Sequence, residues 1–315
     1  MLKRREWARE AKWQSMARPT SNKTSSSVGG GMQFDFDTRD PKLVSRTWKG
    51  IPDRWRATAW YSFLATSAHK RGLKTTDSEL IERYNELQDT NSADDVQIDV
   101  DVPRTINMHI MFRRRYRGGQ RLLFRVLHAI SLQFPETGYV QGMASLAATL
   151  LCYYDEERAF VMLVRLWQLR GLEQLFQAGF EGLMSALGEF ETDWLKGGDV
   201  AQKLEALGIT STAYGTRWYL TLFNMSIPFP AQLRVWDAFM LLGDTAVVGA
   251  GKFGGADLDV LHATSAALID ATREIILDSD FENAMKVLTS FVPVKDEDLL
   301  MRVARTEWRL RKKRE

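Results

Sequence analysis

The chain has 315 residues, 45% of them hydrophobic, which is enough to bury a sizeable core in one or two domains. Its 42 Lys and Arg nearly balance its 40 Asp and Glu, so the net charge of +2 excludes a general attraction to nucleic acid or membranes. A single cysteine, Cys152, excludes an intramolecular disulfide. Because no apolar run suits a signal peptide or a membrane span, we expect a cytoplasmic protein.

The N-terminal stretch is basic and then becomes low in complexity. Residues 1–18 carry six Lys and Arg against two Glu, with Trp7 and Trp13 among them. Residues 20–31 are rich in Ser and Gly, a composition that cannot offset the entropy cost of ordering. We therefore predict that residues 1–40 form a flexible basic tail and linker, and that deleting residues 1–31 leaves activity in solution unchanged. The alternative for residues 1–18 is a basic helix that touches an anionic surface.

From residue 41 onward the apolar residues recur at helical spacing, and no longer repeat indicates a solenoid. The clearest periodic sets are Trp55, Ala59, Trp60 and Phe63; Leu80, Tyr84 and Leu87; Leu123, Val126, Leu127 and Ile130; and Phe160, Val164 and Trp167. The sequence therefore predicts an all-α, multi-helix domain over residues 45–290, with a motif-bearing core over residues 50–245. Residues 291–315 should add a charged C-terminal helix.

The stretch around Arg104 presents an arginine under local constraint. Apolar residues stand at every second position from Val96 to Val102, which is the period of a β-strand. We discount a strand, because Pro103 follows and no partner strand is evident. Pro103 suits the start of a helix, so we expect Arg104 in a first helical turn, at the positive end of the dipole. A guanidinium there suits phosphate oxygens. The ordinary alternative is an ion pair with Asp101.

Two further stretches add candidate residues. Gln141 stands between Gly138 and Gly142, just before a long apolar run of helical period, and a glutamine amide can orient a water molecule. The third stretch, residues 226–237, contains Pro228, Arg234, Trp236 and Asp237. For the last three we favour a structural role, because a buried aromatic beside an ion pair usually fixes helix packing.

Residues 112–121 form a dense basic cluster that includes Arg114 and Arg115. Three uses remain open: binding nucleic-acid phosphates, contacting an acidic protein or lipid surface, or forming a solvated helix face. Four histidines are scattered without the spacing of a zinc site, so we expect no metal. No Gly-x-Ser-x-Gly elbow or dinucleotide fingerprint occurs, so an autonomous enzyme has little support.

Together these stretches resemble a known family. The matching positions are Ile98-x-x-Asp101-x-x-Arg104, Tyr139-x-Gln141 and Arg234-x-Trp236-Asp237, the last preceded by Pro228. They are similar to the Ile-x-x-Asp-x-x-Arg, Tyr-x-Gln and proline-containing Arg-x-Trp-Asp motifs of the TBC domain, the helical family of Rab GTPase-activating proteins. Residues 49–56 also resemble the Gly-Ile-Pro motif near the start of that domain.

The resemblance implies a role for each matching residue. Arg104 would be an arginine finger placed against the phosphates of GTP on a Rab protein, and Gln141 would supply a water-positioning amide in trans. Asp101 would hold the loop of Arg104, and Tyr139 would support Gln141. Pro228 would help to shape the groove that faces the GTPase.

The resemblance also implies the partners. A Rab protein in its GTP form would carry GTP and Mg²⁺, so this chain would need no cofactor of its own. From the charge of the basic cluster we add the hypothesis that Arg114 and Arg115 meet an acidic surface of the GTPase, because such a patch changes encounter rates. Contact with endomembranes would be peripheral, through the partner or the basic N-terminus. The alternatives are a scaffold that binds a GTPase without catalysis and a nucleic-acid binder that uses the basic cluster; we expect no nucleic acid.

Overall fold

The computed structural model describes residues 2–20, 34–106, 109–113, 118–195, 197–245 and 253–313, with side chains from residue 6 onward. These residues are mostly helical, which confirms the all-α prediction. The strands among them are the two-residue pair β1 (Arg18–Pro19) and β2 (Phe34–Asp35), which run antiparallel. Within the described ranges, no helix is long and apolar enough to span a bilayer.

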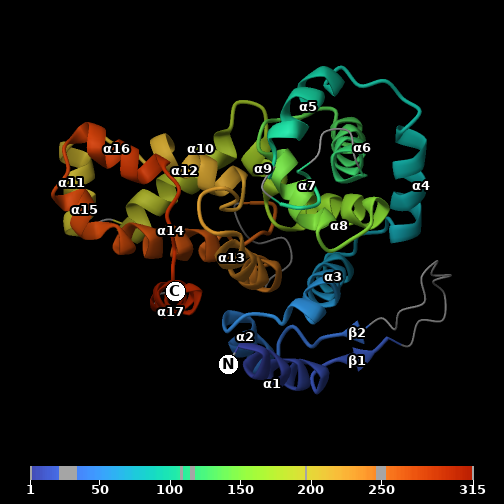
Figure 1. Ribbon diagram of the computed structural model, residues 1–315, viewed down its shortest axis with the longest axis horizontal. Helices are drawn as coiled ribbons and strands as arrows, with labels where there is room; N and C mark the ends of the chain where they lie inside the picture. The colour runs from blue at the N-terminus through green and yellow to red at the C-terminus, as the bar shows by residue number, and fades with distance from the viewer. Residues whose placement is uncertain are drawn as a thin grey trace.

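The helices fall into two groups, and α13 of the second group lies where the two meet, as Figure 1 shows. The first part of the chain forms α1 (Leu2–Gln14), α2 (Pro41–Trp48), α3 (Asp53–Lys70), α4 (Asp77–Leu87), α5 (Asp95–Asp101), the 3-10 turn η1 (Val102–Arg104), α6 (Gly118–Gln133), α7 (Met143–Leu151) and α8 (Glu156–Leu169). Helices α4, α6 and α7 pack around α8, and α3 joins this group to α13.

The second group follows. It contains α9 (Leu172–Phe176), α10 (Glu181–Glu189), the π-helix η2 (Phe190–Leu195), α11 (Asp199–Ala206), α12 (Thr212–Leu220), α13 (Phe229–Leu242), α14 (Asp259–Ala271), α15 (Arg273–Leu277), α16 (Phe281–Thr289) and α17 (Glu297–Lys312). The final helix, α17, packs along α14 and also touches α13 and α2. The apolar periods found in the sequence lie on the buried faces of these helices.

Helix α5 occupies the stretch whose alternating pattern favoured a strand. Ile98 and Val102, four residues apart, are buried, whereas Val96 and Val100 are exposed. This burial follows one face of a helix, because residues four apart lie one turn above each other. The decision to discount a strand here is confirmed.

The first helix corrects the predicted N-terminal tail. Helix α1 exists, as in the alternative interpretation, and Trp13 near its end is only 1% exposed. The Trp13 ring packs edge-on against Phe36 with centroids 5.4 Å apart, and Phe36 packs against Phe63 of α3 at 6.2 Å. The described part of residues 1–40 therefore joins the core, because a large aromatic ring gains much by burial. Residues 21–33, which hold most of the expected linker, lie outside the described residues.

Trp13→Ala should lower the free energy of unfolding by about 3–5 kcal/mol, the usual cost of emptying an aromatic core site. Trp7→Ala is the matched control, because Trp7 lies on the same helix with 68% of its surface exposed; its effect should stay within about 0.5 kcal/mol. Urea unfolding of both variants measures the difference. Deletion of residues 1–31 should destabilise the protein for the same reason, and equal midpoints for both variants would contradict the docking of α1.

Candidate functional site

Arg104 lies at the end of a helical path, not at its start. Helix α5 continues directly into η1, and Thr105 after it is extended, with φ −82° and ψ 121°. The predicted helix start after Pro103 is therefore wrong: Pro103 sits in the first turn of η1, where its missing N–H is tolerated, so the helical path passes through it. The positive end of a helix dipole does not face Arg104, and affinity for an anion must come from its guanidinium.

The carboxylate of Asp101 is the shared acceptor of this site, and its side chain is only 6% exposed. Oδ1 accepts from Nη2 of Arg104 and from Nε2 of Gln97 at 3.2 Å, while Oδ2 accepts from the Tyr139 hydroxyl at 2.8 Å. Nε of Arg104 also donates to the Val100 carbonyl at 3.2 Å. The ion pair with Asp101 therefore forms, yet the Arg104 side chain remains 63% exposed and accessible to a ligand.

Two carboxylates of the α5 region hold Tyr139 at both ends. Its hydroxyl donates to Asp101, and its backbone N–H donates to Oδ2 of Asp94 at 2.8 Å. Asp94 and Asp101 are seven residues apart, about two helical turns, so both carboxylates lie on one face. Burial, and then the bond to Asp101, raises the pKa of Tyr139, which keeps the hydroxyl protonated as a donor.

Asp94 is a positioning residue that sequence reasoning missed. Its partner Tyr139 lies 45 residues further along the chain, beyond any local pattern. The one signal was Gly138, which has φ +62° and packs so closely that a Cβ there would stand 2.8 Å from Oδ2 of Asp94. A glycine immediately before the Tyr-x-Gln pattern therefore marks a close approach.

Gln141 is exposed, one residue before Gly142, which caps α7 with φ +113°. Among the residues that the structure describes, its side chain has no hydrogen-bond partner, so the amide is available to a ligand. The positive end of the α7 dipole lies on its side of the helix. Asp101 and Tyr139 thus link the segment of Arg104 to the loop that carries Gln141, although the two segments are far apart in sequence.

The segment before Pro228 flanks this site. Three non-glycine residues of segment 222–225 have positive φ angles of 47°, 65° and 58°, and Asn224 within it donates to a backbone carbonyl of α7 at 3.3 Å. Pro228 then caps α13. The next ring, Phe229, lies 5.8 Å from the ring of His109, which follows the Arg104 segment. The residues on either side of Pro228 therefore contact α7, which follows the Gln141 loop, and His109, which follows the Arg104 segment.

If the GTPase-activating role that the resemblance implies is assayed, replacing Asp94 with alanine should slow GTP hydrolysis by the partner about tenfold to a hundredfold, because a shift of about 1 Å in a positioned group can cost this much. The loss should appear in kcat more than in KM, since Asp94 acts through the Gln141 loop. Asp94→Asn keeps an oxygen acceptor for the Tyr139 N–H and should recover most of the rate. Asp89→Ala, an exposed change in the same region, is the control; equal kinetics for all three variants would contradict the assignment.

Asp237 forms a separate buried centre that ties α13 to the start of α3. It is 0% exposed and accepts from the Ile51 N–H, from Nε of Arg56 and from Nε1 of Trp60, each at 2.9 Å. Burial raises the pKa of Asp237, and the Arg56 guanidinium opposes that rise. The Gly-Ile-Pro stretch is thus bonded directly to the Trp-Asp stretch, although the two are far apart in sequence.

The expected ion pair next to Trp236 is made differently. Arg234 pairs with Asp298 of α17 at 2.9 Å, and the partner of Asp237 is Arg56. Trp236 donates from Nε1 to the Leu222 carbonyl at 3.0 Å. The sequence interpretation expected an adjacent ion pair but named no partners on other helices, because helical spacing shows only the neighbours on one helix. This group is not part of the Arg104 and Gln141 site.

Two further sequence predictions concern the basic cluster and metal binding. Arg114 and Arg115 lie outside the described residues. Within the described part, Glu189, Asp259 and His262 bring possible metal-ligand atoms within 4.8 Å of one another. Asp259 already pairs with Lys312 at 2.7 Å, and Nδ1 of His262 faces the Tyr219 hydroxyl at 2.6 Å. The absence of a metal remains a prediction.

Comparisons with known proteins agree with these motifs. The family model described as Rab-GTPase-TBC domain matches residues 53–251. A TBC domain-containing protein of Schizosaccharomyces pombe is 42% identical over 96% of this chain and 68% of its own length. The Rab GTPase-activating protein tbc-11 of Caenorhabditis elegans is 28% identical over 82% of this chain, and here the match spans only 26% of the relative.

Solved structures show the same fold. The crystal structure of the Ypt/Rab-GAP domain of Gyp1p superposes with a TM-score of 0.73 at 15% identity, over 98% of this chain and 99% of that one. The Chlamydomonas flagellar RabGAP TBC domain gives 0.65 at 20% identity, over 95% of this chain and 88% of that one. With the matched family model and the S. pombe relative, the chain belongs to the Rab-GTPase-TBC domain family.

Proposed function

We propose that this protein accelerates GTP hydrolysis by a Rab-family GTPase, with Arg104 and Gln141 supplied in trans. The observation that carries the proposal is the buried carboxylate of Asp101, which bonds both the Arg104 guanidinium and the Tyr139 hydroxyl. Through it, an exposed arginine and the loop of an exposed glutamine are fixed relative to each other. Such an arrangement suits a reaction that needs positioning and charge stabilisation more than covalent chemistry.

Each side chain has a task that its chemistry suits. The guanidinium of Arg104 donates to the phosphoryl oxygens, where negative charge spreads during transfer. The amide of Gln141 accepts a hydrogen bond from the attacking water while its NH2 group donates elsewhere. GTP and Mg²⁺ come with the GTPase, so this chain contributes no cofactor. Asp101, Tyr139 and Asp94 act by positioning these two groups.

The relatives support a Rab protein as the partner, and its GTP form is the one in which there is GTP to hydrolyse. The C. elegans relative is named as a Rab GTPase-activating protein, and family membership points the same way. We expect a cytoplasmic protein that reaches endomembranes where its GTPase resides. The runner-up is a scaffold that binds a GTPase without accelerating hydrolysis, and the exposed ion pair of Arg104 is the feature that makes this worth testing.

A hydrolysis screen against a panel of GTP-loaded Rab proteins tests the proposal. At least one Rab protein should hydrolyse GTP much faster in the presence of the full chain, and the effect should be lost with Arg104→Ala. Binding measured on the same panel distinguishes the runner-up. Tight binding to a GTP-loaded Rab protein without any acceleration would establish a scaffold and overturn the catalytic proposal.

A further inference from the structure

Helices α1, α2 and α17 lie together at one end of the molecule, at the bottom of Figure 1, with both chain termini. The contacts confirm their proximity: Nη1 of Arg46 on α2 donates to the Lys12 carbonyl of α1 at 2.8 Å. The rings of Trp48 on α2 and Trp308 on α17 have centroids 5.8 Å apart. This end therefore joins the first and last helices of the chain into one surface.

The outer face of α17 is basic beyond its first turn. Its exposed positions after residue 300 are Arg302, Thr306, Arg309, Leu310 and Lys313. Among the residues described, none of the three cations in this set forms an ion pair with a carboxylate. Burial and the neighbouring Arg309 lower the pKa of Arg305, which reflects how closely the positive charges are placed.

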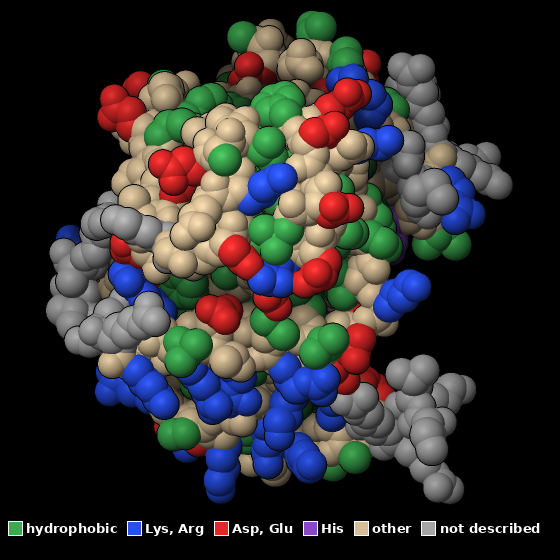
Figure 2. All heavy atoms as spheres, turned by 90° about the vertical axis from the view of Figure 1, so that its left-hand side faces the viewer, with side chains coloured by type: hydrophobic (Ala, Val, Ile, Leu, Met, Phe, Trp, Pro, Cys, Tyr) green, Lys and Arg blue, Asp and Glu red, His purple; other side chains and the backbone are tan. Residues whose placement is uncertain are grey.

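Figure 2 views the molecule from the left-hand side of Figure 1. It shows Lys and Arg side chains gathered along the lower part of that face. The net charge of the whole chain is only +2, so this concentration is a local feature. Like charges placed together without partners destabilise a folded protein slightly, so the cluster is better explained by an anionic ligand than by stability. The attraction for an anionic ligand would be confined to this surface.

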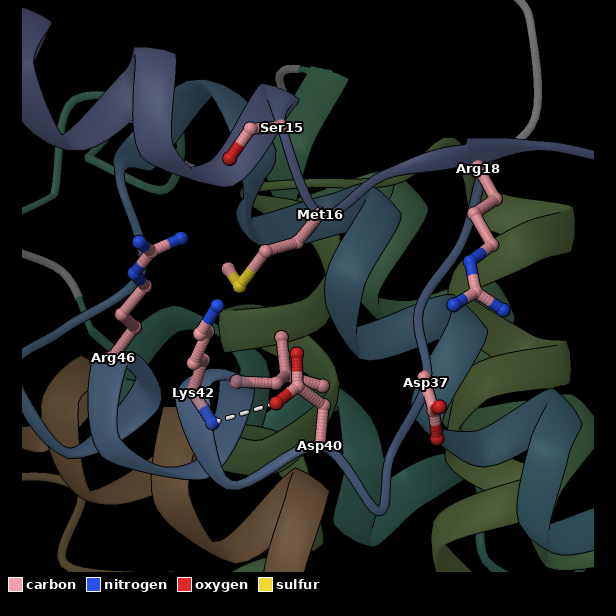
Figure 3. A pocket seen from close by; sticks show the side chains of 8 residues that line it. Ser15, Met16, Arg18, Asp37, Asp40, Lys42 and Arg46 are labelled. Atoms are coloured by element: carbon pink, nitrogen blue, oxygen red, sulfur yellow. Dashed lines mark hydrogen bonds between the residues drawn. The ribbon is translucent and has the colours of Figure 1, made fainter.

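Helices α1 and α2 carry further basic side chains. A pocket of about 210 Å³ between them is lined by Ser15, Met16, Arg18, Asp37, Asp40, Lys42, Leu43 and Arg46, as seen in Figure 3. Its two carboxylates each accept a backbone N–H: Asp40 accepts from Lys42 at 2.8 Å as the cap of α2, and Asp37 accepts from Arg39 at 3.1 Å. The three cations Arg18, Lys42 and Arg46 outnumber them. Lys12 and Lys42 are exposed, and α2, which carries Lys42, touches α17.

Exposed apolar side chains accompany the cations. Trp7 on α1 is 68% exposed and Leu310 on α17 is 47% exposed. Tryptophan is favoured at the boundary between lipid headgroups and acyl chains, and cations beside it are attracted to anionic lipids. An aliphatic side chain such as Leu310 gains nothing from nucleic-acid phosphates, whereas it gains from the membrane interface. The combination favours a lipid surface over nucleic acid.

We propose that the surface formed by α1, α2 and α17, with Lys12, Lys42, Arg302, Arg309 and Lys313 as its exposed cations, binds peripherally to membranes rich in anionic lipids. Helix α5, which leads to Arg104, lies at the opposite end of the molecule in Figure 1. Membrane attachment through this surface therefore leaves the Arg104 and Gln141 site directed away from the bilayer. The inference does not depend on GTPase activation, because its readout is lipid binding alone.

Vesicle co-sedimentation of the full chain tests the proposal. The protein should bind vesicles of phosphatidylcholine with phosphatidylserine, should not bind phosphatidylcholine alone, and should dissociate as salt screens the charges. Each basic residue at such a surface raises affinity about fivefold, so Arg302→Glu with Arg309→Glu should weaken binding by about 25-fold or more. Trp7→Ala should also weaken binding, but without changing its salt dependence.

The matched control is Lys74→Glu with Lys286→Glu, which changes the net charge equally at exposed positions away from this surface. It should keep nearly all of the vesicle binding. Equal losses in the two double variants would show that net charge alone matters, and would overturn the assigned surface. Absence of binding to anionic vesicles, or tighter binding to RNA, duplex DNA or an acidic protein at the same salt, would overturn the lipid partner.

Discussion

Arg104→Ala is expected to slow assisted GTP hydrolysis by a factor of about 1,000 to 100,000, the usual contribution of an arginine supplied in trans. This corresponds to about 4–7 kcal/mol of barrier, at about 1.4 kcal/mol for each tenfold change. The fold should survive, because the Arg104 side chain is 63% exposed and the buried Asp101 carboxylate keeps the Tyr139 hydroxyl and the Gln97 amide as donors. Arg104→Lys should lose most of the acceleration too, since an ammonium cannot donate as a planar fork.

Single-turnover hydrolysis at saturating activator separates this effect from weakened binding. Arg83→Ala is a close control, because Arg83 is 50% exposed and also pairs with a carboxylate three residues away, Glu86, at 3.3 Å. That variant should keep full activity. If Arg104→Lys retained near-normal rates, the bidentate role would be wrong, and unchanged rates for Arg104→Ala would remove Arg104 from the catalytic site altogether.

The contact with Asp101 bears on how Arg104 could act. In the protein alone, Asp101 holds the guanidinium while also accepting from Tyr139 and Gln97. When Arg104 turns toward a phosphate, two donors remain on the buried carboxylate, so it is not left without partners. A side chain already held near its working position loses less rotamer freedom on docking.

Local patterns predicted the helices well, because an amphipathic helix records its buried face in its own sequence. Leu80, Tyr84 and Leu87 are the buried residues of α4, as their spacing indicates. The position of α1 could not be predicted in this way. Its burial rests on one residue, Trp13, which meets Phe36 across the undescribed segment, and composition alone gave no sign of that contact.

The candidate site shows the same difference between local patterns, which could be predicted, and distant contacts, which could not. The motif residues were found because they stand close together in sequence, whereas the bonds of Asp94 to Tyr139 and of Arg56 to Asp237 join residues far apart. The error about the helix start has another cause. Pro103 is compatible with the first turn of a new helix and with a 3-10 turn that extends an earlier one, and only the path of α5 decides between them.

The geometry of Gln141 leads to the second large effect. Its amide is exposed beside the start of α7, and the two carboxylates that hold Tyr139 fix the loop on which it stands. In Ras-type GTPases, a glutamine of the GTPase itself positions the attacking water, so its loss normally prevents assisted hydrolysis. A second glutamine, held rigidly in the activator, can take over that task because its carbonyl accepts from water.

Gln141→Ala should therefore slow hydrolysis by an unaltered Rab protein about a hundredfold or more, the scale expected when a reacting water loses its positioning. A Rab protein with Gln→Ala at its own switch position should remain a substrate of the unaltered chain. Single-turnover hydrolysis with the four combinations measures both effects, and Gln177→Ala, at another exposed glutamine, should behave like the unaltered chain. Full activity of Gln141→Ala, together with complete dependence on the Rab glutamine, would refute the role of Gln141, because the water would then be positioned by the GTPase alone.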